Sequence, residues 1–182
     1  MHERNRLFNG EILIDLSYHE NDVIGVTGGI YIEARPQEVW KTLTDYDNLS
    51  KTLPKVVASR LIEKKNGEII LEQTGKTGIL IFEKTVNFRL KIYEEYLHRV
   101  LFEQISGDFH VYHGEWLLEK HPEQKGTFLH YNAKIKPLFF APPILVSFVQ
   151  RQDLPGILSA HKEHAESAAL YRKKTNMKGH AL

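Results

Sequence analysis

The sequence predicts an α+β fold, in which a curved antiparallel sheet of about seven strands wraps around one long C-terminal helix. Two observations lead to this prediction. Strand patterns follow one another almost without interruption from Lys55 to Pro137, and a proline-rich apolar segment at 137–143 then leads into one long helical pattern. Such a sheet and helix leave room for an apolar molecule between them, so the order of elements favours ligand binding over a catalytic centre.

The strands are predicted from the alternation of apolar and polar side chains. Residues 11–19 alternate in this way, and Asn21-Asp22 then turns the chain into the next strand. Asn66-Gly67 is the strongest hairpin signal of the sequence and fixes the pairing of the strands on either side of it. A meander is the simplest connection for the later strands. Strands are expected at residues 11–19, 23–33, 57–62, 69–74, 79–95, 98–106, 109–120 and 126–136.

Helical patterns occur in two places, as a short pair between the second and third strands and as a long helix near the C-terminus. Pro36 in the first turn opens a helix that ends near Thr44. Asp45 can cap the second short helix, and Pro54 ends it. The long helix reaches about Lys173. Its inner face consists of Leu154, Ile157, Leu158, His161, Ala165 and Ala168. Because this face is rich in small residues, the helix can approach the sheet closely or leave a gap.

Length and composition restrict the class of protein. The 182 residues fit one domain, which we divide into an N-terminal strand extension at 1–22, a ligand-binding domain at 23–173 and a basic tail at 174–182. A net charge of +1 provides no overall positive field, which argues against nucleic acid as a partner. Because the chain has no cysteine, it has no thiol nucleophile, disulfide or thiolate zinc site.

The sequence also bears on cellular location. The N-terminal residues lack the apolar run of a signal peptide, and the longest apolar run, 137–149, contains three prolines and is too short to span a bilayer. Together with the lack of cysteine, these features favour a soluble cytoplasmic protein. No motif predicts a cofactor, and the sequence does not determine an oligomeric state.

Several separated groups of residues carry a family resemblance. They are Glu38-Val39-Trp40, the run 43–49 ahead of Pro54, Gly107-Asp108-Phe109 with Gly114 and Trp116, and Gly126-Thr127 with Leu129 and Tyr131 before Pro137. In residue type and spacing, residues 23–170 resemble the START-like (helix-grip, SRPBCC) superfamily, specifically its polyketide cyclase/dehydrase and coenzyme-Q-binding branch. The resemblance implies a helix-grip fold that binds a lipid, sterol, quinone or polyketide between sheet and helix. Only some members are enzymes, so the fold alone does not settle the function.

Strand parity indicates which side chains face a ligand. If Trp116 points to the concave face of the sheet, His110 and Tyr112 share that face, because side chains in a strand alternate with period two. Each such residue taken alone is more often part of a core than a ligand contact, so the argument rests on the group. The candidate ligand-binding residues are Phe102, His110, Tyr112, Trp116, Leu129, Tyr131, Phe139, Phe140, Phe148 and His161.

Two classes of function remain open. The first is a non-enzymatic carrier of a lipid, isoprenoid quinone or similar apolar molecule, which we favour because no catalytic constellation is evident. The second is a polyketide cyclase or dehydratase in which His110, Tyr112 or Tyr131 moves protons. His161 and His164 lack a definite third ligand, so we predict no metal site. A filled interior would instead indicate a partner-binding module.

The apolar segment 138–149 supports two interpretations. Its aromatic and aliphatic side chains can dip into a membrane surface while a ligand is exchanged. They can equally cover the end of the sheet, since an apolar patch is informative only when it is exposed.

Overall fold

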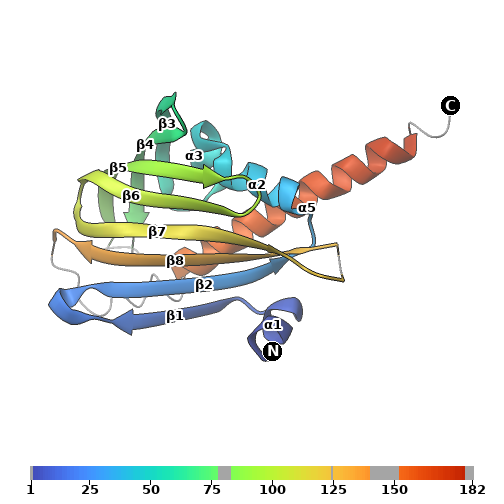
Figure 1. Ribbon diagram of the computed structural model, residues 1–182, viewed down its shortest axis with the longest axis horizontal. Helices are drawn as coiled ribbons and strands as arrows, with labels where there is room; N and C mark the ends of the chain where they lie inside the picture. The colour runs from blue at the N-terminus through green and yellow to red at the C-terminus, as the bar shows by residue number, and fades with distance from the viewer. Residues whose placement is uncertain (1, 78–82, 124, 140–151, 179–182) are drawn as a thin grey trace.

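The computed structural model describes residues 2–77, 83–123, 125–139 and 152–178. An eight-stranded antiparallel sheet with the order β1-β2-β8-β7-β6-β5-β4-β3 bends around the long helix α5 (Figure 1), so the predicted helix-grip fold is confirmed. The elements are α1 (His2–Phe8), β1 (Leu13–Tyr18), η1 (Glu20–Asp22), β2 (Ile24–Ile32), α2 (Pro36–Thr44), η2 (Tyr46–Asn48), α3 (Leu49–Thr52), β3 (Val56–Lys65), β4 (Glu68–Thr77), β5 (Lys84–Glu95), β6 (Arg99–Gly107), β7 (Phe109–Lys120), β8 (Thr127–Pro137) and α5 (Leu154–Lys178).

The sheet follows the predicted meander from β3 to β8, and β8 then pairs with β2. Asn66 and Gly67, with φ angles of 52° and 82°, form the predicted turn between β3 and β4. The predicted strand 79–95 is seen as β5 from Lys84 onward, and positions 79–82 lie outside the described residues. All eight strands expected from the sequence are present, and β1, which we predicted as part of an N-terminal extension, pairs with β2 at one edge and makes the sheet eight-stranded.

The short helix α1 was not predicted. Its side chain Leu7 is fully buried against Tyr31 and Phe128, in a small apolar cluster separate from the main core. Only one side chain of the helix is buried, so its seven residues show no repeating apolar period. The helix is thus specified by a tertiary contact that the local sequence does not reveal.

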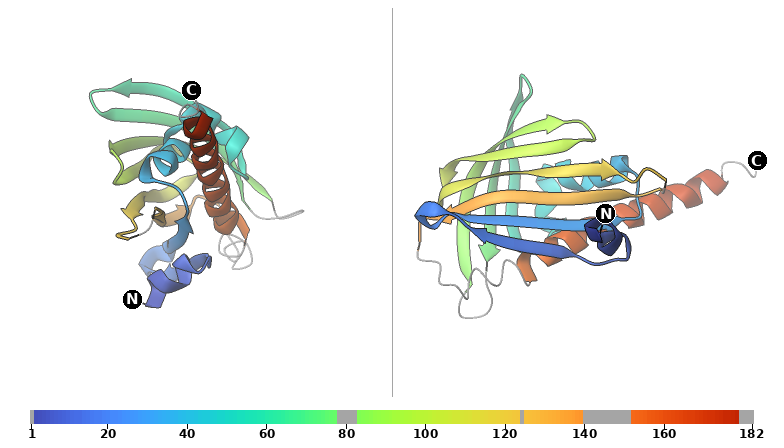
Figure 2. Two further views of the ribbon diagram at one scale, coloured as in Figure 1. Left: turned by 90° about the vertical axis from the view of Figure 1, so that its right-hand side faces the viewer. Right: turned by 60° about the horizontal axis from the view of Figure 1, so that its bottom comes forward.

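Helix α5 runs along the concave side of the sheet and packs against β2 and α2 (Figure 2). Gly28 of β2 permits this approach, because an added Cβ would lie 2.9 Å from Leu154 Cδ2. Ala165 and Ala169 are buried in the contact, whereas Ala168, which we predicted on this face, is exposed. A helix returns to one face after four residues, so Ala169 takes the place given to Ala168. No helix among the described residues is both long and apolar enough to cross a bilayer.

Polar contacts fix the position of α5. Arg172 Nε donates to Glu38 Oε1 over 2.7 Å, and Glu166 Oε1 accepts from the backbone N–H of Glu33 over 2.8 Å. Burial alone would raise the pKa of Glu38, but hydrogen bonds from Arg35 and Arg172 outweigh it and lower that pKa. The ionised carboxylate therefore joins the start of α2 to the C-terminal half of α5.

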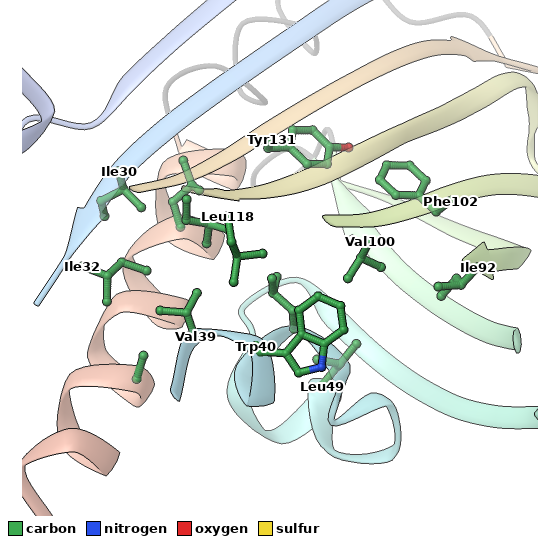
Figure 3. Packing of buried hydrophobic residues seen from close by; sticks show 14 of the residues in the cluster. Ile30, Ile32, Val39, Trp40, Leu49, Ile92, Val100, Phe102, Leu118 and Tyr131 are labelled. Carbon is green, nitrogen blue, oxygen red and sulfur yellow. The ribbon is translucent and has the colours of Figure 1, made fainter. Parts of the chain in front are cut away.

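One apolar core fills the space between the sheet, α2 and the middle of α5. Figure 3 shows Ile30 and Ile32 of β2, Val39 of α2 and Leu118 of β7 converging on this space. Each is at most 4 % exposed. The core occupies only part of the length of these strands, which continue beyond it to the candidate site.

Candidate functional site

A cavity of about 280 Å³ lies between the concave face of the sheet and the first turns of α5. Ile24 at the start of β2 lines the cavity, whereas Ile32 at the end of the same strand is packed in the core. The helix is divided in the same way, since Ile157 and His161 line the cavity and Ala169 lies in the core. The same elements therefore contribute both to the packed core and to the cavity wall.

Aromatic side chains form much of the cavity wall. Phe88 of β5 lies edge-on to Phe109 and Tyr112 of β7, with ring centroids 5.9 and 5.3 Å apart. Trp116 of β7 packs against Tyr131 of β8 at 4.6 Å. Aliphatic side chains complete a predominantly apolar lining, including Ile24, Leu43, Leu53, Leu71, Val86 and Ile157. Such a lining suits an apolar ligand held by a few polar contacts.

His161 is the most deeply buried polar group in the wall. It is 1 % exposed, its Nδ1 lies 2.9 Å from Thr42 Oγ1, and the Trp116 ring stands edge-on to it at 5.3 Å. Its Nε2 has no hydrogen-bond partner within the described part of the chain. Burial, with a smaller effect of His164, lowers the pKa of His161 to about 3. The imidazole is therefore neutral at physiological pH.

Tyr112 and Tyr131 place two phenol groups in the cavity wall. Burial raises the pKa of Tyr112, an effect that the interaction with the Tyr131 hydroxyl partly offsets. Burial and the neighbouring Tyr112 raise the pKa of Tyr131 well above its usual value. Both groups are therefore protonated and can act as hydrogen-bond donors.

Charged side chains gather at the end of the cavity where β4 finishes. Thr77 Oγ1 donates to Asp153 Oδ2 over 2.9 Å, and Lys55 Nζ lies 3.9 Å from Asp153 Oδ1. Lys55 and Lys76 both pair with Glu83, at 3.3 and 2.7 Å. Hydrogen bonds from these lysines lower the pKa of Glu83. The cavity therefore has one polar end besides its apolar walls.

The structure brings half of the candidate ligand-binding residues together in the cavity wall, namely Tyr112, Trp116, Tyr131, Phe139 and His161. Their contact with a ligand stays a prediction. Phe102 is buried behind the wall, where its ring stacks on Tyr131 with centroids 6.0 Å apart. Leu129 is fully buried in the core. The candidates Phe140 and Phe148 lie outside the described residues.

The predicted orientation of His110 is wrong. A β-bulge shifts the register of β7 against β8, so that Phe109 pairs with Pro137 but Val111 pairs with Lys136. The extra residue reverses the alternation of side chains. As a result, Phe109 lines the cavity and His110 is exposed. His110 therefore stands apart from Tyr112 and Tyr131 and cannot work with them in the cavity.

Several residues of the site were not predicted from the sequence. Phe88 shares a strand face with Val86 and Leu90, so the period of β5 could have revealed it. Thr42 touches His161 from α2, a contact between residues 119 positions apart in the chain. No local pattern signals such a contact. His164 does not share the buried environment of His161. It is exposed, and its Nε2 lies 3.2 Å from the carbonyl oxygen of Thr52.

A sheet bent around a C-terminal helix, with an apolar cavity between the two, defines the helix-grip fold, which a START superfamily protein from Mycobacterium smegmatis shares. Residues 32–162 match the family described as polyketide cyclase / dehydrase and lipid transport, and the chain belongs to that family. The family resemblance recognised in the sequence is thereby confirmed, while binding of coenzyme Q stays a prediction.

Solved structures share this fold at low sequence identity. A protein from Thermus thermophilus is 20 % identical with a TM-score of 0.66, over 80 % of this chain and 99 % of the other. The ZhuI aromatase/cyclase from a Streptomyces species is 14 % identical with a TM-score of 0.68, over 79 % and 94 %. A STAR-related lipid transfer protein from Xanthomonas axonopodis is 16 % identical with a TM-score of 0.61, over 84 % and 98 %. No curated protein matches the chain.

Proposed function

We propose that the protein binds and carries an apolar small molecule, such as a lipid, an isoprenoid quinone or a polyketide-like compound, in the cavity between the sheet and α5. The observation that carries the proposal is the largely apolar and aromatic lining of a space of about 280 Å³. The description of the family, which includes lipid transport, supports it.

The state of the polar groups in the wall favours carriage over acid–base chemistry. A general acid or base works best when its pKa lies near the working pH. The pKa of His161 is lowered to about 3, and those of Tyr112 and Tyr131 are raised above their usual value of 10. These three groups therefore keep their protonation state near pH 7 and serve as fixed polar contacts for a ligand.

Native mass spectrometry tests the proposal directly. We expect the protein, as purified or after incubation with phospholipid and quinone mixtures, to carry one apolar adduct that solvent extraction releases. Ile157→Trp places a bulky side chain in the cavity and should abolish the adduct. Glu163→Trp adds the same side chain on the exposed face of α5 and should retain it. An apo mass under all conditions, or an adduct that survives Ile157→Trp, would contradict the proposal.

A second candidate function is that of a polyketide cyclase or dehydratase. It is favoured by the two protonated phenols of Tyr112 and Tyr131, which could hydrogen-bond a substrate carbonyl while the cavity folds the chain. The exposed His110 has no part in this version. With a poly-β-ketone substrate, Tyr131→Phe would then abolish turnover and retain binding. A protein that binds such a substrate without any turnover would exclude this candidate.

We further propose that the protein is cytoplasmic and exchanges its ligand at a membrane surface through residues 138–149, of which 140–149 lie outside the described residues. Leu138 is 52 % exposed, and Lys84 Nζ lies 5.3 Å from the centre of the Phe139 ring, which places a cation beside apolar side chains. Co-sedimentation with vesicles tests this. Leu138→Asp should weaken binding to vesicles that contain anionic lipid, and unchanged binding would contradict the idea.

A further inference from the structure

The hydrogen bonds around His161 assign its tautomer. Thr42 Oγ1 lies 2.8 Å from the carbonyl oxygen of Val39 and 2.9 Å from His161 Nδ1. A carbonyl oxygen cannot donate, so the single proton of the Thr42 hydroxyl must point to Val39 if that short contact is a hydrogen bond. The lone pair of Thr42 Oγ1 then accepts from His161, which requires a proton on Nδ1.

This assignment leaves Nε2 of His161 as a bare acceptor. A neutral imidazole carries one N–H, and here that proton is on Nδ1. Burial lowers the pKa of His161 to about 3, so no second proton binds at neutral pH. The side chain is 1 % exposed, lines the cavity, and has no partner for Nε2 within the described residues. A buried acceptor without a partner is costly, and a ligand that supplies a donor removes that cost.

We propose that His161 Nε2 accepts a hydrogen bond from a hydroxyl group of the ligand, so that the cavity selects apolar alcohols or phenols over the corresponding ethers. The inference rests on the proposed function and gives it a chemical class of ligand. Thr42 acts as a positioning residue, because it holds the proton on Nδ1 and keeps Nε2 free to accept. An ether oxygen offers only lone pairs, so it leaves Nε2 without a partner and meets it with like partial charge.

Calorimetric titration with matched probes tests the selection. We expect the wild type to bind 2-naphthol about tenfold more tightly than 2-methoxynaphthalene, because one buried hydrogen bond changes an affinity by about that factor. In His161→Phe the two affinities should become nearly equal. The matched control His164→Phe replaces an exposed histidine three residues further along α5 and should keep the full preference.

Variants of Thr42 test the positioning role. Thr42→Ser keeps a hydroxyl beside His161 and should preserve the preference for 2-naphthol. Thr42→Val removes the acceptor for Nδ1–H, so the preference should fall by most of its size. The split between these two variants is a result that loss of packing alone would not produce.

The state of His161 can also be measured without a ligand. Long-range ¹H–¹⁵N correlation spectra of the free protein should show an Nδ1 of the protonated type and an Nε2 of the unprotonated type at neutral pH. A charged ring or an Nε2–H tautomer would overturn the inference even if probes bind. Equal binding of both probes to the wild type, or a preference that survives His161→Phe, would overturn it and leave the proposed function standing. Failure of both probes and of naphthalene to bind would count against both proposals.

Discussion

The position of the His161 ring is fixed by contacts from two other elements. Thr42 of α2 holds Nδ1, and Trp116 of β7 packs edge-on against the ring. Burial keeps the imidazole neutral, because charging it would require moving an ion into an apolar site. The imidazole therefore stays neutral in the cavity wall, at a cost to stability at low pH.

This cost leads to a prediction about pH. An unfolded histidine binds a proton below pH about 6.5, whereas folded His161 does so only near its pKa of about 3. Between these values the unfolded state binds more protons, so the free energy of unfolding should fall with falling pH, by up to about 1.4 kcal/mol per pH unit. His130, whose pKa burial also lowers, should add to the effect.

Urea unfolding at several pH values from neutral to about pH 5 measures this slope. His161→Phe should reduce it, since phenylalanine cannot take up a proton. His110→Phe replaces an exposed histidine and should leave the slope of the wild type. Equal slopes for the wild type and His161→Phe would show that His161 does not resist protonation in the folded state.

At the scale of elements, β7 marks the limit of what alternation predicts. The positions of Tyr112 and Trp116 on the cavity side follow from period two, and the structure has them there. The bulge between Phe109 and Val111 reverses the alternation of side chains before Tyr112. The local run of aromatic and polar residues does not indicate where the extra residue lies. Gly107, with a φ of 141°, and a register shift between Gln104 and Ser106 of β6 are nearby irregularities of the backbone.

Because of the bulge, Phe109 lines the cavity and the neighbouring His110 does not, so alanine variants of the two residues should differ in ligand affinity. Phe109→Ala removes a ring from the cavity wall and should weaken binding of 2-naphthol by about tenfold. His110→Ala changes an exposed side chain and should leave the affinity unaltered. Calorimetric titration of both variants measures the difference. Weaker binding by His110→Ala alone would mean that β7 has no bulge in solution.

At the scale of the whole molecule, the sequence predicts the order of elements but not where the interior is filled. The face of α5 carries small residues, which allows either close approach to the sheet or a gap. Both occur, because Ala165 and Ala169 are packed in the core while Ile157 and His161 border the cavity. Whether a position on α5 is packed or borders a space depends on side chains of other elements, chiefly β2 and α2, which are distant in the sequence, so no local pattern predicts it.

Core positions and cavity positions of α5 should therefore respond differently to added volume. Ala165→Leu inserts methylene groups into a fully buried position and should lower the free energy of unfolding by about 1–3 kcal/mol. Ile157→Phe directs a larger ring toward the cavity and should cost less than about 1 kcal/mol, because space is present to receive it. Urea unfolding at neutral pH compares them. Equal costs would mean that the interior is filled along the whole helix, and a surface for a protein partner would then explain the molecule better than a ligand cavity.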